Sequence, residues 1–177
     1  MSNVSTDDIL NELKDVLAGV TPEDVRRTAN CILSHKRVFV CGAGRTGLML
    51  KAFAMRLMQS GLTAYVAGET VTPAVGARDL LFLATASGST HTIVHSAEVA
   101  LNAGADLFVV TAEADSAITA LHKADVVLPA GGKDAAGRSR QIMGSLFEQA
   151  LLVFCDAVVQ CLPLDPERMR QRHANLE

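Results

Sequence analysis

Apolar residues follow two different periods along the chain, and the periods separate predicted strands from predicted helices. Short, nearly continuous apolar runs of strand length occur at 37–41, 63–66, 80–84, 106–111 and 125–128. Segments with the 3.6-residue period of an amphipathic helix follow four of these runs, and the longest extends from about 141 to 160. This alternation predicts an α/β fold, a three-layer sandwich in which helices cover both faces of a five-stranded parallel sheet.

Two further helical patterns precede the first strand. Residues 4–18 carry apolar side chains on one face and acids on the other, and Thr21 and Pro22 are typical of the cap and first residue of a second helix. The first of these helices is suited to a contact between subunits, and packing within the chain explains its pattern equally. We expect a single domain, 1–177, with N-terminal helices at 1–35, an α/β core at 36–162 and a C-terminal tail at 163–177.

The composition disfavours several classes of function. The chain has 16 Lys and Arg against 19 Asp and Glu residues, one Tyr and no Trp, so it lacks the basic excess and the aromatic platforms of nucleic-acid binding. No apolar run approaches the roughly 20 residues of a membrane-spanning helix, and residues 1–8 lack the basic and apolar regions of a secretory signal. We therefore expect a cytoplasmic protein without nucleic-acid or membrane partners.

The distribution of the four cysteines is consistent with the expected cytoplasmic location. They are scattered through apolar or helical segments and form no C-x-x-C pair. Such a pattern is typical of reduced, buried thiols and not of a zinc site. The residues concerned are Cys31, Cys41, Cys155 and Cys161.

The third predicted strand ends in a cluster of small hydroxyl residues just before a helical pattern. A helix start offers unpaired N–H groups and the positive end of its dipole, and hydroxyls add further donors. The cluster therefore predicts an anion site, most simply for a phosphate, with its glycine letting the ligand approach the backbone. A single capping hydroxyl is the alternative, but it leaves the other hydroxyls unexplained. The loop consists of Thr85, Ala86, Ser87, Gly88, Ser89 and Thr90.

A second glycine-rich loop follows the first strand. Its glycines, within residues 42–47, match the G-x-G-x-x-G pattern of dinucleotide folds, and Glu69 follows at about the distance of a ribose-binding acid. A dinucleotide site is therefore one interpretation. The loop equally suits a contact of Arg45 and Thr46 with a sugar phosphate, or a turn needed only for tight packing of strand and helix.

Glu148 is the strongest candidate for acid–base chemistry. It lies near the start of the apolar last helix, beside Phe147 and Leu151. Apolar surroundings disfavour the charged form of a carboxylate and raise its pKa toward the range of a general base. The spacing Ser145-x-x-Glu148 also matches the pattern of a capping box, in which Glu148 would only accept a hydrogen bond from a backbone N–H. The pattern by itself leaves both interpretations open.

The histidines carry weaker information. His91 and His95 lie four residues apart on one helical face, but no third ligand accompanies them, so we expect exposed histidines and no metal site. His173 belongs to a polar C-terminal segment that can reach a site only by folding over its own sheet or that of a neighbour. Lys133 and Arg138 are cations of the loop after the fifth strand.

Five motifs extend a common pattern over nearly the whole chain: GAGRTG at 42–47, GETVTP at 68–73, SGST at 87–90, MGSLFEQ at 143–149 and RHANLE at 172–177. Together they resemble the sugar isomerase (SIS) domain family, and within it the 6-phospho-3-hexuloisomerases. SIS domains have a flavodoxin-like parallel sheet, and their Ser/Thr-rich loop binds the phosphate of phosphosugars. Thr46 departs from the more usual serine of the first loop and keeps its hydroxyl.

The resemblance implies an isomerase that interconverts D-arabino-hex-3-ulose 6-phosphate and D-fructose 6-phosphate in formaldehyde fixation by the ribulose monophosphate pathway. It implies that Glu148 is the base of an enediol mechanism that needs neither metal nor cofactor. The loop 85–90 then binds the phosphate, while Thr46 and Arg45 hold the sugar chain. For His173 the resemblance implies ring opening or proton transfer, and it replaces the dinucleotide interpretation of the first loop.

The resemblance also implies partners. SIS relatives form dimers or tetramers with shared active sites, so we expect a homo-oligomer, and the activity pairs functionally with 3-hexulose-6-phosphate synthase. Two other functions stay open. One is a different aldose–ketose isomerase of phosphosugars from the same family, and the other is a phosphosugar sensor without catalysis.

Overall fold

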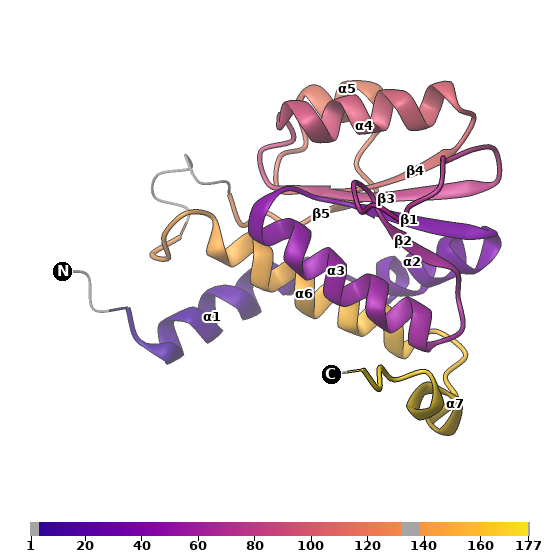
Figure 1. The fold of residues 1–177 in the computed structure, drawn as a ribbon. Helices are drawn as coiled ribbons and strands as arrows, with labels where there is room; N and C mark the ends of the chain where they lie inside the picture. Colours follow the sequence, from indigo (N-terminus) through magenta and orange to yellow (C-terminus); the bar gives the residue numbers. More distant parts are fainter. Residues whose placement is uncertain (1–3, 132–138, 177) are drawn as a thin grey trace.

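The computed structural model describes residues 4–131 and 139–176, in which five parallel strands form one sheet (Figure 1). The strand order β2-β1-β3-β4-β5 confirms the predicted five-stranded parallel sheet. Strand β2 is one residue shorter than predicted, and β5 keeps only two residues. The strands are β1 (Arg37–Cys41), β2 (Ala64–Val66), β3 (Asp79–Thr85), β4 (Asp106–Thr111) and β5 (Val126–Val127).

Helices cover both faces of the sheet, as predicted for a three-layer sandwich (Figure 1). Successive strand residues point to opposite faces, and the core divides accordingly: Val40 and Phe82 pack on one side, Phe39 and Leu83 on the other. The first side carries α1 (Thr6–Leu17), α2 (Pro22–Ser34), α3 (Gly44–Gln59) and α6 (Ser145–Gln160), and the second carries α4 (His91–Asn102) and α5 (Ala117–Leu121).

The order of the strands reverses at β1, which has β2 on one side and β3 on the other. In open parallel sheets such a reversal leaves a crevice outside the carboxyl ends of the two strands concerned, because their connections leave in opposite directions. The loops after β1 and β3, which the sequence singled out, therefore lie side by side.

The last long helix begins four residues later than the predicted start at 141. Met143 and Gly144 adopt left-handed backbone angles, with φ of 57° and 77°. That conformation cannot continue a right-handed helix, and glycine tolerates it best. The apolar spacing of 141–144 thus imitates helix, but α6 starts at Ser145 with Gly144 as its N-cap.

The chain termini add two helices around the α/β core. α1 packs against α6 of the same chain through Leu13, Val16 and Leu17, so internal packing accounts for its apolar face and the contact between subunits stays a prediction. The tail contains a short helix, α7 (Pro166–Gln171), that the sequence did not predict; Asp165 caps it. Within the described residues, every helix is too short or too polar to cross a membrane.

Candidate functional site

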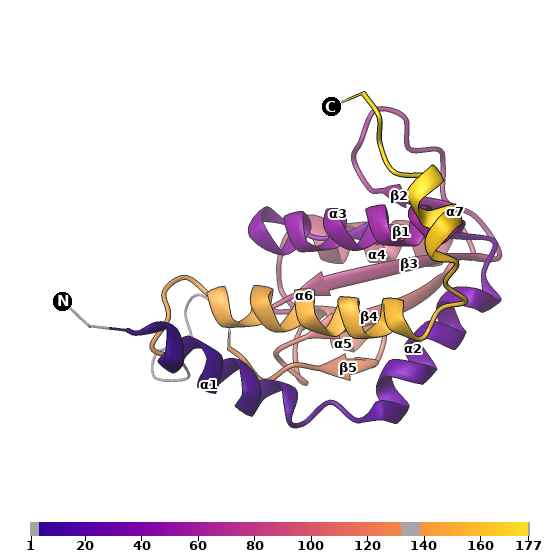
Figure 2. The ribbon, with the colours of Figure 1, turned by 90° about the horizontal axis from the view of Figure 1, so that it is seen from below.

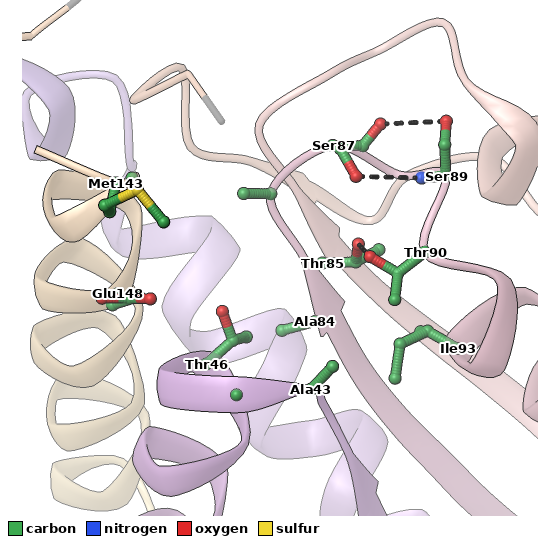
Figure 3. Close-up of a pocket in the computed structure, with 13 residues that line it drawn as sticks. Ala43, Thr46, Ala84, Thr85, Ser87, Ser89, Thr90, Ile93, Met143 and Glu148 are labelled. Carbon is green, nitrogen blue, oxygen red and sulfur yellow. Dashed lines mark hydrogen bonds between the residues drawn. The ribbon is translucent and has the colours of Figure 1, made fainter. Parts of the chain in front are cut away.

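A cavity of about 520 Å³ opens at the carboxyl ends of β1 and β3, where the strand order reverses (Figure 3). The N-terminal ends of α3, α4 and α6 converge on it, so three helix dipoles present their positive ends to one space. Its lining consists of Ala43, Gly44, Thr46, Ala84, Thr85, Ala86, Ser87, Ser89, Thr90, Ile93, Met143, Gly144 and Glu148.

The hydroxyl loop between β3 and α4 forms one wall of the cavity. Thr90 is the N-cap of α4, yet among the described residues its hydroxyl makes no capping bond and lies 3.4 Å from the hydroxyl of Thr85. The hydroxyl of Ser87 accepts a hydrogen bond from Ser89 N, and the hydroxyl of Ser89 donates one to Ser87 O, both at 3.3 Å. The capping interpretation is therefore wrong, and the first N–H groups of α4 stay available to an anion.

One member of the predicted anion loop turns away from the cavity. Gly88 accepts a hydrogen bond from Ile118 N at 2.8 Å and so packs against the start of α5. It does not belong to the lining, in contrast to its neighbours Ser87 and Ser89. This glycine shapes the loop, and the approach of a ligand to its backbone stays a prediction.

The glycine-rich loop after β1 is shorter than the motif suggests, because α3 already begins at Gly44. A Cβ at Gly47 would lie 2.5 Å from the carbonyl oxygen of Gly42, so two of the glycines allow the helix to pack closely on the strand. Thr46 faces the cavity and is 8% exposed. Glu69 forms an ion pair with Lys51 at 2.5 Å, outside the cavity lining.

Glu148 lies on the wall opposite the hydroxyl loop (Figure 3). Since Ser145 is the first helical residue and not the N-cap, the capping-box interpretation is wrong. The side chain of Glu148 is 13% exposed, and its Oε2 is buried without a hydrogen-bond donor among the described residues. This oxygen forms an ion pair with Arg45 and lies at the edge of the cavity.

Arg45 is the charged neighbour of that carboxylate. Its Nη1 donates a hydrogen bond to Ser145 Oγ at 3.0 Å and lies 2.9 Å from Glu148 Oε2 without directing an N–H at it. Burial raises the pKa of Glu148 above its ordinary value, and the positive charge of Arg45 offsets part of this rise. The contact joins residues about 100 positions apart in sequence.

The model of the SIS domain family matches residues 32–153, a range that includes the complete cavity lining. This chain belongs to the SIS domain family. The predicted resemblance is thereby confirmed, and it extends to curated relatives named 3-hexulose-6-phosphate isomerase. The relative from Mycobacterium gastri is 47% identical over 96% of this chain and 88% of its own length. The relative from Bacillus subtilis is 40% identical over 96% of both chains.

A solved structure agrees with these relatives. The crystal structure of a Methanococcus jannaschii protein has a TM-score of 0.81 and 29% identity to this chain, and the match covers 97% of this chain and 98% of the other. The molecular function inferred for that protein is 3-hexulose-6-phosphate isomerase.

His173 lies outside both the cavity and the range matched by the SIS model. The neighbouring Arg172 donates to Gln59 O at 3.1 Å, at the C-terminal end of α3, whereas the cavity adjoins the N-terminal end of that helix. The two ends are roughly 20 Å apart. His173 is exposed, with a ring nitrogen 3.1 Å from Ala174 O. Within one chain, the SIS fold does not bring His173 to Glu148.

His91 and His95 lie next to each other on α4. The rings of His91 and His95 are nearly parallel, with centroids 6.4 Å apart, and both residues lie outside the lining of the site. Across residues 4–131 and 139–176, no group of three His, Cys, Asp or Glu side chains is placed to hold a metal ion. Lys133 and Arg138 lie outside the described residues.

The cysteine prediction is partly wrong. Cys41 and Cys155 are buried as expected, and burial raises the pKa of both thiols. Cys161 is exposed because it is the C-cap of α6, where the helix reaches solvent. Cys31 is half-buried.

Sequence reasoning missed the segment that delivers Glu148 to the cavity. Met143 and Gly144 line the site, together with Ile93 from the first turn of α4. The glycine beside a polar Ser145, directly ahead of an apolar run, was the available sign of a helix start. The apolar residues ahead of this glycine have helical spacing, so the prediction placed the helix start too early and overlooked the glycine.

Proposed function

We propose that this chain is a 3-hexulose-6-phosphate isomerase, which interconverts D-arabino-hex-3-ulose 6-phosphate and D-fructose 6-phosphate. The observation that carries the proposal is the mostly buried carboxylate of Glu148, which pairs with Arg45 and faces a wall of hydroxyls across the cavity. The names of the curated relatives, which match over nearly the whole chain, support the same reaction.

The reaction moves a carbonyl from C3 to C2 and needs one base. The carboxylate of Glu148 takes the proton from C2, the released electron pair forms a C2–C3 double bond, and the carbonyl oxygen at C3 becomes an enediolate oxygen. The proton on O2 passes to O3, and the carboxyl group returns its proton to C3 as the C2 carbonyl forms. A positioned base of this kind contributes about 10²–10⁴-fold to the rate.

The raised pKa of Glu148 suits this role because the same group must accept and return a proton. Arg45 keeps the carboxylate ionised and supplies positive charge beside the developing enediolate. The hydroxyl of Thr46, which faces the cavity, is a further donor to that oxygen. Proton transfer beside a carbonyl requires only a base and such donors, so we propose a mechanism without metal or cofactor.

The phosphate binds on the opposite wall. Ser87, Ser89 and Thr90 supply hydroxyls, and the open N-terminus of α4 supplies N–H groups and a positive dipole. Ala86 belongs to the same wall. Binding energy from the phosphate positions the distant reacting carbons against Glu148.

Further parts of the proposal concern the assembly. We propose a homo-oligomer in which the exposed tail carries His173 to the site of a neighbouring subunit, since the chain's own cavity is too far away. There His173 would assist ring opening or proton transfer. We also propose that the enzyme acts in the cytoplasm, after 3-hexulose-6-phosphate synthase in formaldehyde fixation by the ribulose monophosphate pathway.

Hydrogen exchange at carbon tests the proposal. Fructose 6-phosphate is incubated in D₂O with EDTA and with wild-type protein or Glu148→Gln, and proton NMR follows the C1 and C3 positions. We expect loss of the C3 proton signal with wild type only, alongside formation of the 3-ketose. Exchange at C1 would indicate an aldose–ketose isomerase instead, exchange at neither position a sensor, and C3 exchange by both proteins a different base.

A further inference from the structure

A carboxylate on the N-terminal helix is bound to the turn that precedes α6. Glu12 Oε1 accepts a hydrogen bond from Arg140 N at 2.6 Å, and Oε2 accepts from Ser139 Oγ at 2.8 Å and from Gln141 Nε2 at 3.1 Å. On the same helix, Asp8 forms an ion pair with Arg140. These contacts join positions more than 120 residues apart in sequence.

The turn is exposed at its apolar residues. Ile142 and Met143, the apolar residues that follow, are 77% and 70% exposed, so hydrophobic packing does not fix their positions. Met143 also has a left-handed φ of 57°, which costs free energy in any residue with a Cβ. A strained, exposed turn keeps one conformation only when its surroundings determine it.

Hydrogen bonds connect this turn to the start of the helix that carries Glu148. Ile142 O accepts hydrogen bonds from both the backbone N and the hydroxyl of Ser145, the first residue of α6. Met143 and Gly144 line the cavity, and Glu148 follows one helical turn later. Figure 2 shows α1 lying along the segment that leads into α6.

We propose that Glu12 is a positioning residue for Glu148: it clamps residues 139–141 to α1 and thereby sets the turn from which α6 directs the carboxylate into the cavity. The proposal rests on the proposed role of Glu148 as the base. The charge state of Glu12 agrees with it: partial burial favours the neutral acid, but the hydrogen bonds from Arg140, Gln141 and Ser139 outweigh this effect and lower the pKa of Glu12. The carboxylate of Glu12 is therefore ionised at neutral pH.

The test replaces Glu12 by Gln, which keeps the size of the side chain but exchanges one acceptor oxygen for a donor. Hydrogen–deuterium exchange with mass spectrometry follows peptides that cover 139–150, and steady-state kinetics follow kcat and KM. We expect exchange in that segment to accelerate about tenfold and kcat to fall about tenfold, with KM changed by less than about twofold. Peptides of the 85–90 loop should exchange as in wild type.

Two controls make the result specific. Glu23→Gln changes an exposed carboxylate on α2 that pairs with Arg26 one turn along, and it should alter neither exchange nor kcat. Ser139→Ala removes one of the hydrogen-bond donors to Glu12. The double variant Glu12→Gln/Ser139→Ala should lose no more activity than Glu12→Gln alone, because both substitutions disrupt the same set of hydrogen bonds.

Wild-type exchange and wild-type kcat in Glu12→Gln would overturn the proposal, as would accelerated exchange with unchanged kcat. Failure of the proposed base is recognised separately, since Glu148→Gln would then stay active. Even in that case the exchange rates of 139–150 decide whether Glu12 holds the turn.

Discussion

At the residue scale, the proposed chemistry rests on one carboxylate and its charged neighbour. Glu148 is mostly buried and lacks a hydrogen-bond donor on Oε2 within the described residues, so burial favours its neutral form and raises its pKa. Arg45 favours the ionised form from 2.9 Å away. Because the base acts only when ionised, activity should disappear as the pH falls through the raised pKa of Glu148.

Replacing Arg45 by Gln should therefore shift the pH dependence of activity in a defined direction. Loss of the positive charge raises the pKa of Glu148 further, so the acidic limb of the kcat/KM profile should shift to higher pH. Rate measurements across the acidic range check this shift. Arg56→Gln removes a cation from the same helix, where it contacts Gln59, and should leave the limb in place. An unshifted limb in Arg45→Gln would show that Arg45 does not act on the base.

At the element scale, three helices begin at the cavity without side-chain caps. Ala43 and Gly144 precede α3 and α6 and have no side-chain oxygen, and the hydroxyl of Thr90 makes no capping bond to α4 within the described residues. By contrast, Ser5 and Thr21 cap α1 and α2, which begin away from the cavity. The open helix starts favour an anion between them.

The double variant Ser87→Ala/Ser89→Ala tests the phosphate wall. Each hydrogen bond to a charged group contributes about 1.5–3 kcal/mol, so KM for the phosphosugar should rise at least about tenfold. Thermal stability should change little, because these hydroxyls make only 3.3 Å contacts within their own loop. Ser60→Ala, at the far end of α3, is the matched control and should keep the wild-type KM. An unchanged KM in the double variant would contradict the phosphate site.

At the scale of the whole molecule, the position of the tail separates His173 from the cavity of its own chain. Arg172 holds the tail at the C-terminal end of α3, so a catalytic His173 requires a second subunit. The SIS model ends at residue 153 and therefore gives no information on this segment.

Mixing inactive subunits tests the shared site. Glu148→Gln and His173→Ala should each be inactive alone, but a dimer that contains one of each has one site with both residues intact. After dissociation and random reassociation in equal amounts, activity should return to about a quarter of wild type, since half the dimers are mixed and each has one complete site. Full activity of His173→Ala alone, or no recovery on mixing, would exclude the shared site.

The amino-acid sequence by itself determined the order of strands and helices, because alternating apolar runs and helical periods are local properties of the chain. It also singled out the candidate site residues: the hydroxyl cluster of 85–90 and a carboxylate with apolar neighbours are visible without a fold. Local patterns gave wrong predictions where the same residue spacing is compatible with two different local structures. The apolar residues ahead of α6 imitated a helix, and Ser145-x-x-Glu148 imitated a capping box.

Only the tertiary structure decided between these alternatives. The left-handed Met143 and Gly144 move the helix start to Ser145, and the packing of α6 places Glu148 at the cavity beside Arg45. Likewise, Gly88 turns toward α5 and Glu12 reaches the turn before α6. Such contacts join residues far apart in sequence, and their geometry depends on how helices pack on a twisted sheet. No local pattern contains that information.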